Sequence, residues 1–129
     1  MVKKLIWILL AMLLLTACGQ DKENKQEAVY MNITAKQAKE IMDSQEGYII
    51  LDTRTAEEYN EGHIPGAVLL PHEDVKDKAH VVLPDKNQLI LVYCRSGRRS
   101  KLASEDLVKL GYTNIREFGG IIDWPYEVE

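Results

Sequence analysis

Residues 94–100 (CRSGRRS) combine a nucleophile with the composition of an anion-binding loop. Cys94 follows an apolar run at 89–93, which is typical of a buried strand, and precedes a helical pattern at 101–110. Backbone N–H groups at a helix N-terminus bind anions, and nearby arginines strengthen this field. The same surroundings favour the thiolate, which is the nucleophilic form of cysteine. The sequence therefore predicts a cysteine enzyme that acts on a small anionic substrate.

The positive charge of this loop contrasts with the rest of the chain. Four cations fall within seven residues, at Arg95, Arg98, Arg99 and Lys101, whereas the whole chain has a formal net charge of −4. Domains that bind nucleic acid usually carry a basic face or stripe. An acidic domain with one local basic cluster therefore argues against nucleic acid as a partner.

The first residues have the pattern of an export signal. Lys3 and Lys4 precede an apolar run at 5–15, which is shorter than the roughly 20 residues of a membrane-spanning helix. Such a segment is typical of a signal peptide. The run is followed by Thr16-Ala17-Cys18, which resembles the lipobox of bacterial lipoproteins. This resemblance implies cleavage before Cys18 and a diacylglyceryl thioether on its sulfur. The alternatives are an ordinary signal peptide with a chance cysteine, or an uncleaved anchor.

These features divide the chain into a lipoprotein signal peptide at 1–17, a flexible polar tether at 18–28 and a folded domain at 29–129. Loss of the two lysines of the signal peptide takes the net charge from −4 to −6. The remaining length suffices for one domain with one hydrophobic core. We expect an extracytoplasmic protein that is anchored to the bacterial cell membrane through lipid on Cys18.

The chain contains two cysteines, so a lipid on Cys18 leaves Cys94 as the only free thiol. An intramolecular disulfide is then impossible, although exported proteins commonly use cysteine for disulfides. A buried, inert thiol is the alternative. The neighbouring glycine and arginines favour a reactive thiol.

Strand and helix signals alternate along the predicted domain. Thr34 with Gln37, and Thr55 with Glu58, are spaced as capping boxes at the starts of two helices. Alternating strands and helices predict a parallel α/β sheet, in which ligands bind beyond the carboxyl ends of the strands. The last helix is expected to turn Leu102, Ala103, Leu107 and Leu110 inward. Strands are predicted at 48–51, 67–70, 89–93 and 114–118, and helices from 35 onward and at 55–61, 71–78 and 99–110.

Two separated motifs resemble the signature of the rhodanese family. The first is Asp52-Thr53-Arg54 with Glu58-Tyr59 and 62–67 (GHIPGA), and the second is 92–100 (VYCRSGRRS). Gly119-Gly120 with Trp124 resembles the usual end of the domain. The resemblance covers residues 33–124 and implies a single domain with a five-stranded parallel sheet flanked by helices. It also implies sulfurtransferase activity through a cysteine persulfide.

This resemblance implies a role for each residue of the loop. The Cys94 thiolate would attack the outer sulfur of a small anionic donor such as thiosulfate, and an acceptor such as cyanide or a thiol would then remove that sulfur. Backbone N–H groups would hold the charge of the persulfide, and Gly97 would permit the tight turn. Arg98 or Arg99 would hold the sulfonate of the donor, and Ser100 would offer a hydroxyl. The predicted substrate-binding residues are Arg95, Ser96, Gly97, Arg98, Arg99 and Ser100.

Two other functions stay open at this point. Cysteine phosphatases and arsenate reductases resemble this design but have an arginine six positions after the cysteine, where this chain has Ser100. The shorter loop suits one sulfur atom better than a phosphate. A persulfide carrier without efficient turnover would have the same loop. No organic cofactor is expected, and His72 and His80 lack the spacing of metal ligands, so no metal site is predicted.

The charged residues of the first motif are expected to be structural. Asp52 and Arg54 are predicted to form a structural network of ion pairs and turn contacts with Glu58; the alternative is that they form part of the rim of the active site. His63 is expected to fix the turn at 62–66, where Gly and Pro end regular structure; the alternative is a role as proton donor.

Overall fold

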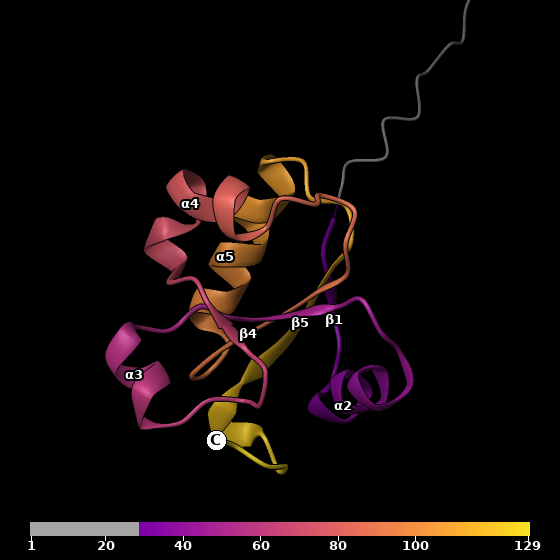
Figure 1. Cartoon of the computed structure of the whole chain (residues 1–129), viewed down its shortest axis with the longest axis vertical. Coiled ribbons are helices and arrows are strands. Elements are labelled where there is room, and N and C mark those ends of the chain that lie inside the picture. Colours follow the sequence, from indigo (N-terminus) through magenta and orange to yellow (C-terminus); the bar gives the residue numbers. More distant parts are fainter. Residues whose placement is uncertain (1–28) are drawn as a thin grey trace, which may run out of the picture.

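Five parallel strands form one sheet with the order β1-β5-β4-β2-β3 (Figure 1). The strands are β1 (Met31–Asn32), β2 (Ile49–Asp52), β3 (Val68–Leu69), β4 (Ile90–Cys94) and β5 (Ile115–Gly120). The computed structural model describes residues 29–129. The predicted signal peptide at 1–17, the predicted lipidation site Cys18 and the predicted tether at 18–28 lie outside the described residues. The prediction of an α/β domain with a five-stranded parallel sheet is confirmed.

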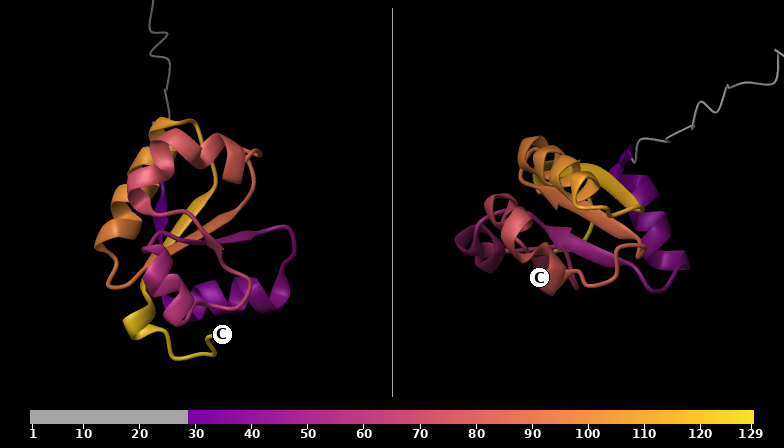
Figure 2. Two further views of the ribbon diagram at one scale, coloured as in Figure 1. Left: turned by 60° about the vertical axis from the view of Figure 1, so that its left-hand side comes forward. Right: turned by 90° about the horizontal axis from the view of Figure 1, so that it is seen from above.

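Helices cover both faces of this sheet. They are α2 (Ala35–Ser44), α3 (Ala56–Glu61), α4 (Val75–Val82) and α5 (Arg98–Lys109), with the short 3₁₀ turns η1 (His72–Asp74) and η2 (Ile121–Asp123). The helices α4 and α5 lie against one face, whereas α2 and α3 lie on the other (Figures 1 and 2). Within residues 29–129 no helix has both the length and the apolar composition needed to cross a bilayer.

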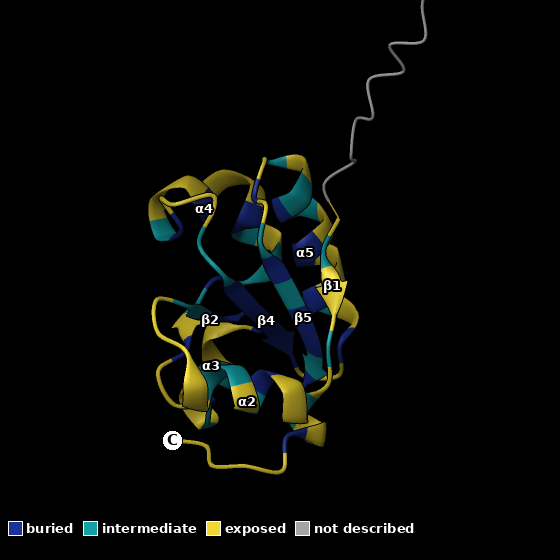
Figure 3. Ribbon diagram, turned by 90° about the vertical axis from the view of Figure 1, so that its right-hand side faces the viewer, coloured by how far each residue is buried: buried dark blue, intermediate teal, exposed yellow. Residues whose placement is uncertain are grey.

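Strand β4 runs through the middle of the sheet and is buried along its whole length (Figure 3). Its side chains alternate between two hydrophobic cores. Ile90 and Val92 pack with residues of α4 and α5, whereas Leu91 and Tyr93 pack on the side of α2. A strand that is buried on both faces carries a continuous apolar run, which is the pattern of the sequence at 89–93. Cys94, the last residue of this strand, therefore lies at the carboxyl edge of the sheet.

Both predicted capping boxes are confirmed. Oγ1 of Thr34 accepts a hydrogen bond from the N–H of Gln37 at 3.1 Å, and Oε1 of Gln37 accepts one from the N–H of Thr34 at 2.9 Å. Thr55 and Glu58 make the same reciprocal contacts at 3.2 and 3.3 Å. These contacts satisfy backbone donors that a helix leaves free in its first turn. They explain why α2 and α3 begin at the predicted residues.

Other features differ from the prediction. The segment predicted as one helix at 71–78 forms η1 and then α4, and the strand predicted at 114–118 extends to Gly120. Leu102, which was expected to face the core, is 43% exposed. Successive helical residues are about 100° apart, so Leu102 lies well away from the direction of its buried neighbour Ala103. The buried residues of α5 are Ser100, Ala103, Ser104 and Leu107.

Candidate active site

Cys94 is the last residue of β4, directly before the turn that leads into α5. Arg95, Ser96 and Gly97 form this loop, and α5 begins at Arg98. The N–H of Gly97 donates a hydrogen bond to Sγ of Cys94 at 3.0 Å. Gly97 has a φ of +103°, a backbone conformation that favours glycine. Cys94 is only 1% exposed, so its sulfur is almost fully enclosed.

Gly119 and Gly120, at the end of β5, lie directly against the loop at 95–97, and we call these two residues the glycine floor. A Cβ on Gly120 would lie 2.0 Å from the carbonyl oxygen of Arg95, and one on Gly97 would lie 3.5 Å from Cα of Gly119. The N–H of Ile122 donates a hydrogen bond to the same Arg95 oxygen at 3.2 Å. Loop and floor thus meet backbone against backbone, which leaves no room for a side chain at position 120.

The cations of the loop and of the first turn of α5 differ in their surroundings. Arg99 makes a bidentate ion pair with Glu58 of α3, with N–O distances of 2.6 and 2.9 Å. The hydrogen bonds from Arg99 lower the pKa of Glu58 from 4.5 to about 2, and the same contact raises the pKa of Arg99. Arg95, Arg98 and Lys101 are exposed and form no ion pair with another described residue. An anion therefore finds Arg95 or Arg98 more available than Arg99.

The two serines of the predicted site have opposite surroundings. Ser96 is exposed, whereas Ser100 is fully buried in the first turn of α5. Oγ of Ser100 lies 2.7 Å from Oε1 of Glu117 and 3.0 Å from the carbonyl oxygen of Gly97. A hydroxyl has one proton to donate, so a bond from Ser100 to a transferred sulfur would compete with these contacts. The predicted substrate contacts of both serines stay predictions.

Glu117 of β5 is 2% exposed and lies beside the loop, although neither motif includes it. Its Oε1 accepts hydrogen bonds from Oγ of Ser100 at 2.7 Å and from the N–H of Gly119 at 2.8 Å. Strand alternation is the sequence signal that would have identified it. Because alternate residues of a strand share a face, Glu117 lies on the same face as the buried Ile115.

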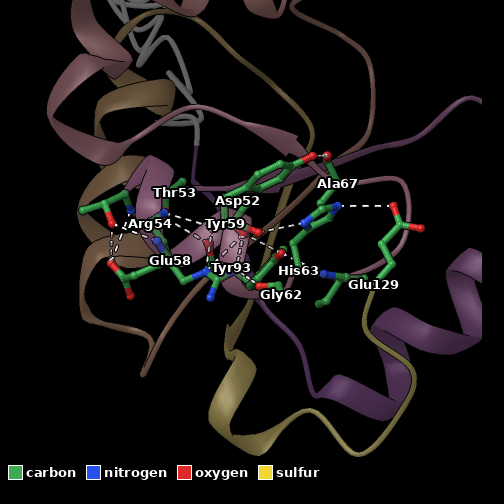
Figure 4. Close-up of polar contacts among 12 residues, drawn as sticks. Asp52, Thr53, Arg54, Glu58, Tyr59, Gly62, His63, Ala67, Tyr93 and Glu129 are labelled. Atoms are coloured by element: carbon green, nitrogen blue, oxygen red, sulfur yellow. Dashed lines mark hydrogen bonds and ion pairs between the residues drawn. The ribbon is translucent and has the colours of Figure 1, made fainter.

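A buried ion pair lies at the carboxyl end of β2, next to β4 (Figure 4). Asp52 is fully buried and accepts hydrogen bonds from Nε and Nη2 of Arg54 at 3.0 and 2.7 Å. The hydroxyl of Tyr93 donates to Oδ2 of Asp52 at 2.7 Å and accepts from the N–H of Ile64 at 3.1 Å. Burial and the bond to Asp52 raise the pKa of Tyr93. The predicted pairing of Asp52 with Arg54 is present.

Glu58 is not a member of this network, contrary to the prediction. It is the third residue of α3, where its carboxylate accepts hydrogen bonds from Thr55 and pairs with Arg99 across the mouth of the site. From the first turn of α3, Glu58 reaches Arg99 of α5 and forms no hydrogen bond or ion pair with Asp52 or Arg54. The pair links the helix that follows β2 to the helix that follows Cys94.

The turn after α3 is fixed by contacts with two side chains (Figure 4). Arg54 donates a hydrogen bond to the carbonyl oxygen of Gly62 at 2.6 Å. His63 stacks on Tyr59 with ring centroids 3.8 Å apart, and its Nδ1 lies 2.9 Å from the carbonyl oxygen of Tyr59. Its Nε2 lies 3.2 Å from Oε1 of Glu129. These contacts support the predicted structural role of His63. Within residues 29–129 no group of three His, Cys, Asp or Glu side chains has the arrangement of metal ligands.

A cavity of about 310 Å³ opens between α3 and η2, beside the loop. It is lined by Arg54, Glu58, Glu61, Arg95, Ile121 and Ile122. Arg54 and Glu58 are engaged in the ion pairs described above, which leaves Arg95 as the cation available to a ligand there. A larger cavity, of about 480 Å³, lies between α2 and the C-terminal segment and includes no residue of the loop. Of these two cavities, the smaller one, which is lined by Arg95 but not by Cys94, is therefore the candidate site for an anionic group beside the loop.

Comparison with known proteins shows the family of this chain. The Rhodanese-like domain family matches residues 34–125. Thiosulfate sulfurtransferase PspE of Escherichia coli (strain K12) is 40% identical over 73 residues, which are 57% of this chain and 70% of that protein. The putative sulfur carrier protein YrkF of Bacillus subtilis (strain 168) is 33% identical over 112 residues, which are 86% of this chain and 60% of that protein.

A solved structure described as rhodanese with anions from E. coli has the same fold. It superposes with a TM-score of 0.60 and 35% sequence identity, over 64% of this chain and 96% of that one. The match of the family spans strands β2 to β5, the helices and both motifs, and begins just after β1. From the fold, the loop and these matches together, we conclude that this chain belongs to the rhodanese-like domain family.

Proposed function

We propose that this protein is a sulfurtransferase that moves a sulfane sulfur from thiosulfate, or a similar small anionic donor, to a thiol or cyanide through a persulfide on Cys94. The observation that supports this most directly is the hydrogen bond from the N–H of Gly97 to Sγ of Cys94 at 3.0 Å. A donor in this position at the start of α5 stabilises negative charge on sulfur. The relatives named a thiosulfate sulfurtransferase and a putative sulfur carrier support the same chemistry.

The proposed reaction has two balanced steps. The Cys94 thiolate attacks the outer sulfur of thiosulfate, a new S–S bond forms, and the S–S bond of thiosulfate breaks with its electron pair leaving on sulfite. The cysteine persulfide keeps one negative charge. The acceptor, cyanide or a thiolate, then attacks the terminal sulfur and displaces the Cys94 thiolate. No oxidant or reductant is consumed over the cycle.

Arg95 and Arg98 are the cations best suited to the sulfonate end of the donor. A guanidinium matches an oxyanion in charge and hydrogen-bond geometry. Both side chains are exposed and unpaired among the described residues, and Arg95 lines the cavity beside the loop. Arg99 is already neutralised by Glu58. We therefore assign donor binding to the first two arginines and a structural role to the third.

The enclosure of Cys94 favours a small donor. Because the residue is 1% exposed, a substrate must present a narrow atom such as the outer sulfur of thiosulfate. Three residues separate Cys94 from the first residue of α5. A loop of this length suits one transferred sulfur better than the three oxygens of a phosphate ester, so phosphatase or arsenate reductase chemistry is less favoured.

A persulfide carrier is the second candidate, supported by the similarity to the putative sulfur carrier protein YrkF. A carrier would form the same persulfide on Cys94 but would pass its sulfur to a partner protein. The two functions therefore differ in turnover with small acceptors.

Intact mass spectrometry of the protein without its predicted signal peptide distinguishes these functions. We expect thiosulfate to add the mass of one sulfur atom at Cys94, and cyanide to remove it with thiocyanate formed over many turnovers. One loading event without turnover would favour the carrier. No sulfur on Cys94 with any persulfide donor, together with hydrolysis of a phosphate ester, would contradict both sulfur functions.

We also propose that the mature protein is held outside the cytoplasm by a lipid on Cys18. The apolar run at 5–15 and the small residues before Cys18 support this proposal. Growth of the producing cells with labelled palmitate tests it. We expect label in the wild-type protein and none in Cys18→Ser, whereas label in Cys18→Ser would contradict the proposal.

A further inference from the structure

We propose that Glu117 is a positioning residue for the nucleophile. One oxygen of its carboxylate ties the loop that carries the Gly97 N–H to the glycine floor beneath it, and thereby sets the hydrogen bond on Sγ of Cys94. The consequence for catalysis rests on the proposed function. The effect on the sulfur itself does not, because it follows from the hydrogen bonds alone.

The contacts of a single oxygen atom support this role. Oε1 of Glu117 accepts hydrogen bonds from Ser100 in α5 at 2.7 Å and from Gly119 in the floor at 2.8 Å. Oγ of Ser100 also lies 3.0 Å from the carbonyl oxygen of Gly97. The N–H of that same Gly97 donates to Sγ of Cys94 at 3.0 Å. Because the Ser100 hydroxyl has one proton, which it donates to Glu117 here, Oε1 is linked to Gly97, the residue that binds the sulfur, through Ser100 and the first turn of α5.

The same oxygen also holds the other side of the contact between loop and floor. A Cβ on Gly97 would lie 3.5 Å from Cα of Gly119 and 3.9 Å from Oε1 of Glu117. The three residues thus meet in one closely packed region in which small shifts are transmitted directly. A carboxylate that binds both segments fixes their separation.

A β-bulge explains how Glu117 reaches this position. Val92 pairs with Glu117 and Cys94 pairs with Gly120, so β5 contains one residue more than β4 over this stretch. Bulges bend a strand and change the direction of its side chains, and they are common beside active sites. Gly119, with a φ of +88°, lies within the bulge and donates its N–H to the carboxylate.

A purely structural role for Glu117 makes a different prediction. If Glu117 only accepts the hydrogen bond from the backbone N–H of Gly119 in the bulge, that bond is the one it needs. If Glu117 is a positioning residue, it also needs the bond to Ser100. Burial makes either role demanding, because a buried carboxylate is tolerated only with good hydrogen-bond partners. The two roles differ in whether loss of the Ser100 bond changes the reactivity of Cys94.

Charge has to be separated from hydrogen bonding in the test. A negative Glu117 near the loop would disfavour a thiolate, whereas its bond to Ser100 would favour one through Gly97. Arg99 on α5 interacts with Cys94, Asp52 and Glu58, and Glu117 interacts with Tyr30. Arg95, Arg98 and Lys101 are the exposed cations of the loop and the first turn of α5. The comparison must therefore leave all of these groups unchanged and hold the charge at position 117 constant.

Two neutral variants meet this condition. Glu117→Gln keeps an acceptor oxygen, and Glu117→Leu has none. In both we would measure the rate of Cys94 alkylation by iodoacetamide as a function of pH, and kcat/KM for thiosulfate. We expect Glu117→Leu to need a higher pH for half-maximal alkylation and to have a kcat/KM about tenfold below that of Glu117→Gln, because the Gly97 N–H loses its alignment. Glu117→Gln should stay within about threefold of wild type.

Ile115→Val is the matched stability control, since it removes one methyl group from a buried core residue of the same strand. Ser100→Ala removes the hydroxyl that donates to Glu117. Introduced alone, it should raise the pH at which alkylation of Cys94 is half-maximal. Combined with Glu117→Leu, it should cause no further rise. If the leucine variant does not fold, Ser100→Ala alone decides the question.

Identical alkylation profiles in Glu117→Gln and Glu117→Leu would overturn the proposal, and so would an unchanged profile in Ser100→Ala. Failure of thiosulfate turnover in the wild-type protein, with the alkylation profiles still differing between the two Glu117 variants, would instead refute the proposed function and leave the positioning role intact.

Discussion

Replacing Gly120 with alanine tests how closely the loop fits its floor. The new Cβ would lie 2.0 Å from the carbonyl oxygen of Arg95, 2.4 Å from its carbonyl carbon and 2.6 Å from Cα of Ser96. All three are backbone atoms, so no rotation of a side chain relieves the contact. Loop and floor must separate by about 1 Å before the closest pair reaches 3.0 Å, below which real Cβ contacts are essentially absent.

A shift of this size reaches the nucleophile. The displaced loop carries the N–H of Gly97, which lies 3.0 Å from Sγ of Cys94, and a further shift of about 1 Å takes this contact to the outer limit of a hydrogen bond to sulfur. Misplacement of reacting groups by about 1 Å lowers rates about 100-fold. We expect kcat/KM for thiosulfate to fall by about that factor, and the stability to fall by roughly 1–3 kcal/mol from overpacking.

The assay is thiocyanate formation, with thermal unfolding of the same samples followed by circular dichroism. Gly47→Ala is the matched control, because Gly47 has a φ of +76° and a Cβ there would meet nothing within 4 Å. This control should lose about 1 kcal/mol of stability from backbone strain and keep its activity. Wild-type turnover in a folded Gly120→Ala protein would refute the reasoning.

Three further substitutions test other parts of the site. Cys94→Ser should abolish sulfur loading and keep the fold, because the sheet holds this position; sulfur bound by the variant, detected by mass spectrometry, would remove Cys94 from its role. Arg99 lowers the pKa of Glu58 from 4.5 to about 2, so the pair stabilises the fold above the higher value and its contribution is lost as pH falls through the lower one. The stability advantage of wild type over Glu58→Gln in urea unfolding should therefore shrink between these pH values, and a difference independent of pH would contradict the assignment. Arg95→Gln should weaken the fall of kcat/KM with rising ionic strength, because less positive charge attracts the donor; equal salt dependence in variant and wild type would exclude Arg95 from donor binding.

The features that were predicted from sequence are those whose signals are local. Each capping box lies within four residues, and both Thr34 and Thr55 begin helices as expected. The apolar run that forms β4 needs no partner to be recognised, because burial on both faces of a sheet demands it. The position of Cys94 at the end of that strand followed from the same local reasoning.

The features that were missed depend on contacts between distant residues. Arg99 and Glu58 are 41 positions apart, and nothing local indicates that they pair. Glu117 meets Ser100 only because β5 lies beside β4 and carries a bulge at this point. The misjudged orientation of Leu102 has a simpler origin, since apolarity alone does not say which face of a helix meets the sheet.

The end of β4 shows why charged residues that do not touch the sulfur belong to the site. Successive residues of a strand point to opposite faces, so Tyr93 and Cys94 are supported from different sides. On one side, the Tyr93 hydroxyl is bound to Asp52, and its carbonyl oxygen accepts bonds from Thr53 at 2.9 and 3.0 Å. These contacts come from the end of β2, the strand next to β4.

On the other side, Cys94 rests on the loop that Glu117 ties to the end of β5. The position of the sulfur is thus supported from β2 and from β5, the two strands next to β4. The conformation of the loop side chains contributes little to that support. Arg95 and Arg98 are exposed and carry none of these contacts. Substitutions at these two positions are therefore expected to change which anion is attracted while the nucleophile keeps its place, which would separate substrate preference from the proposed persulfide chemistry within a single short loop.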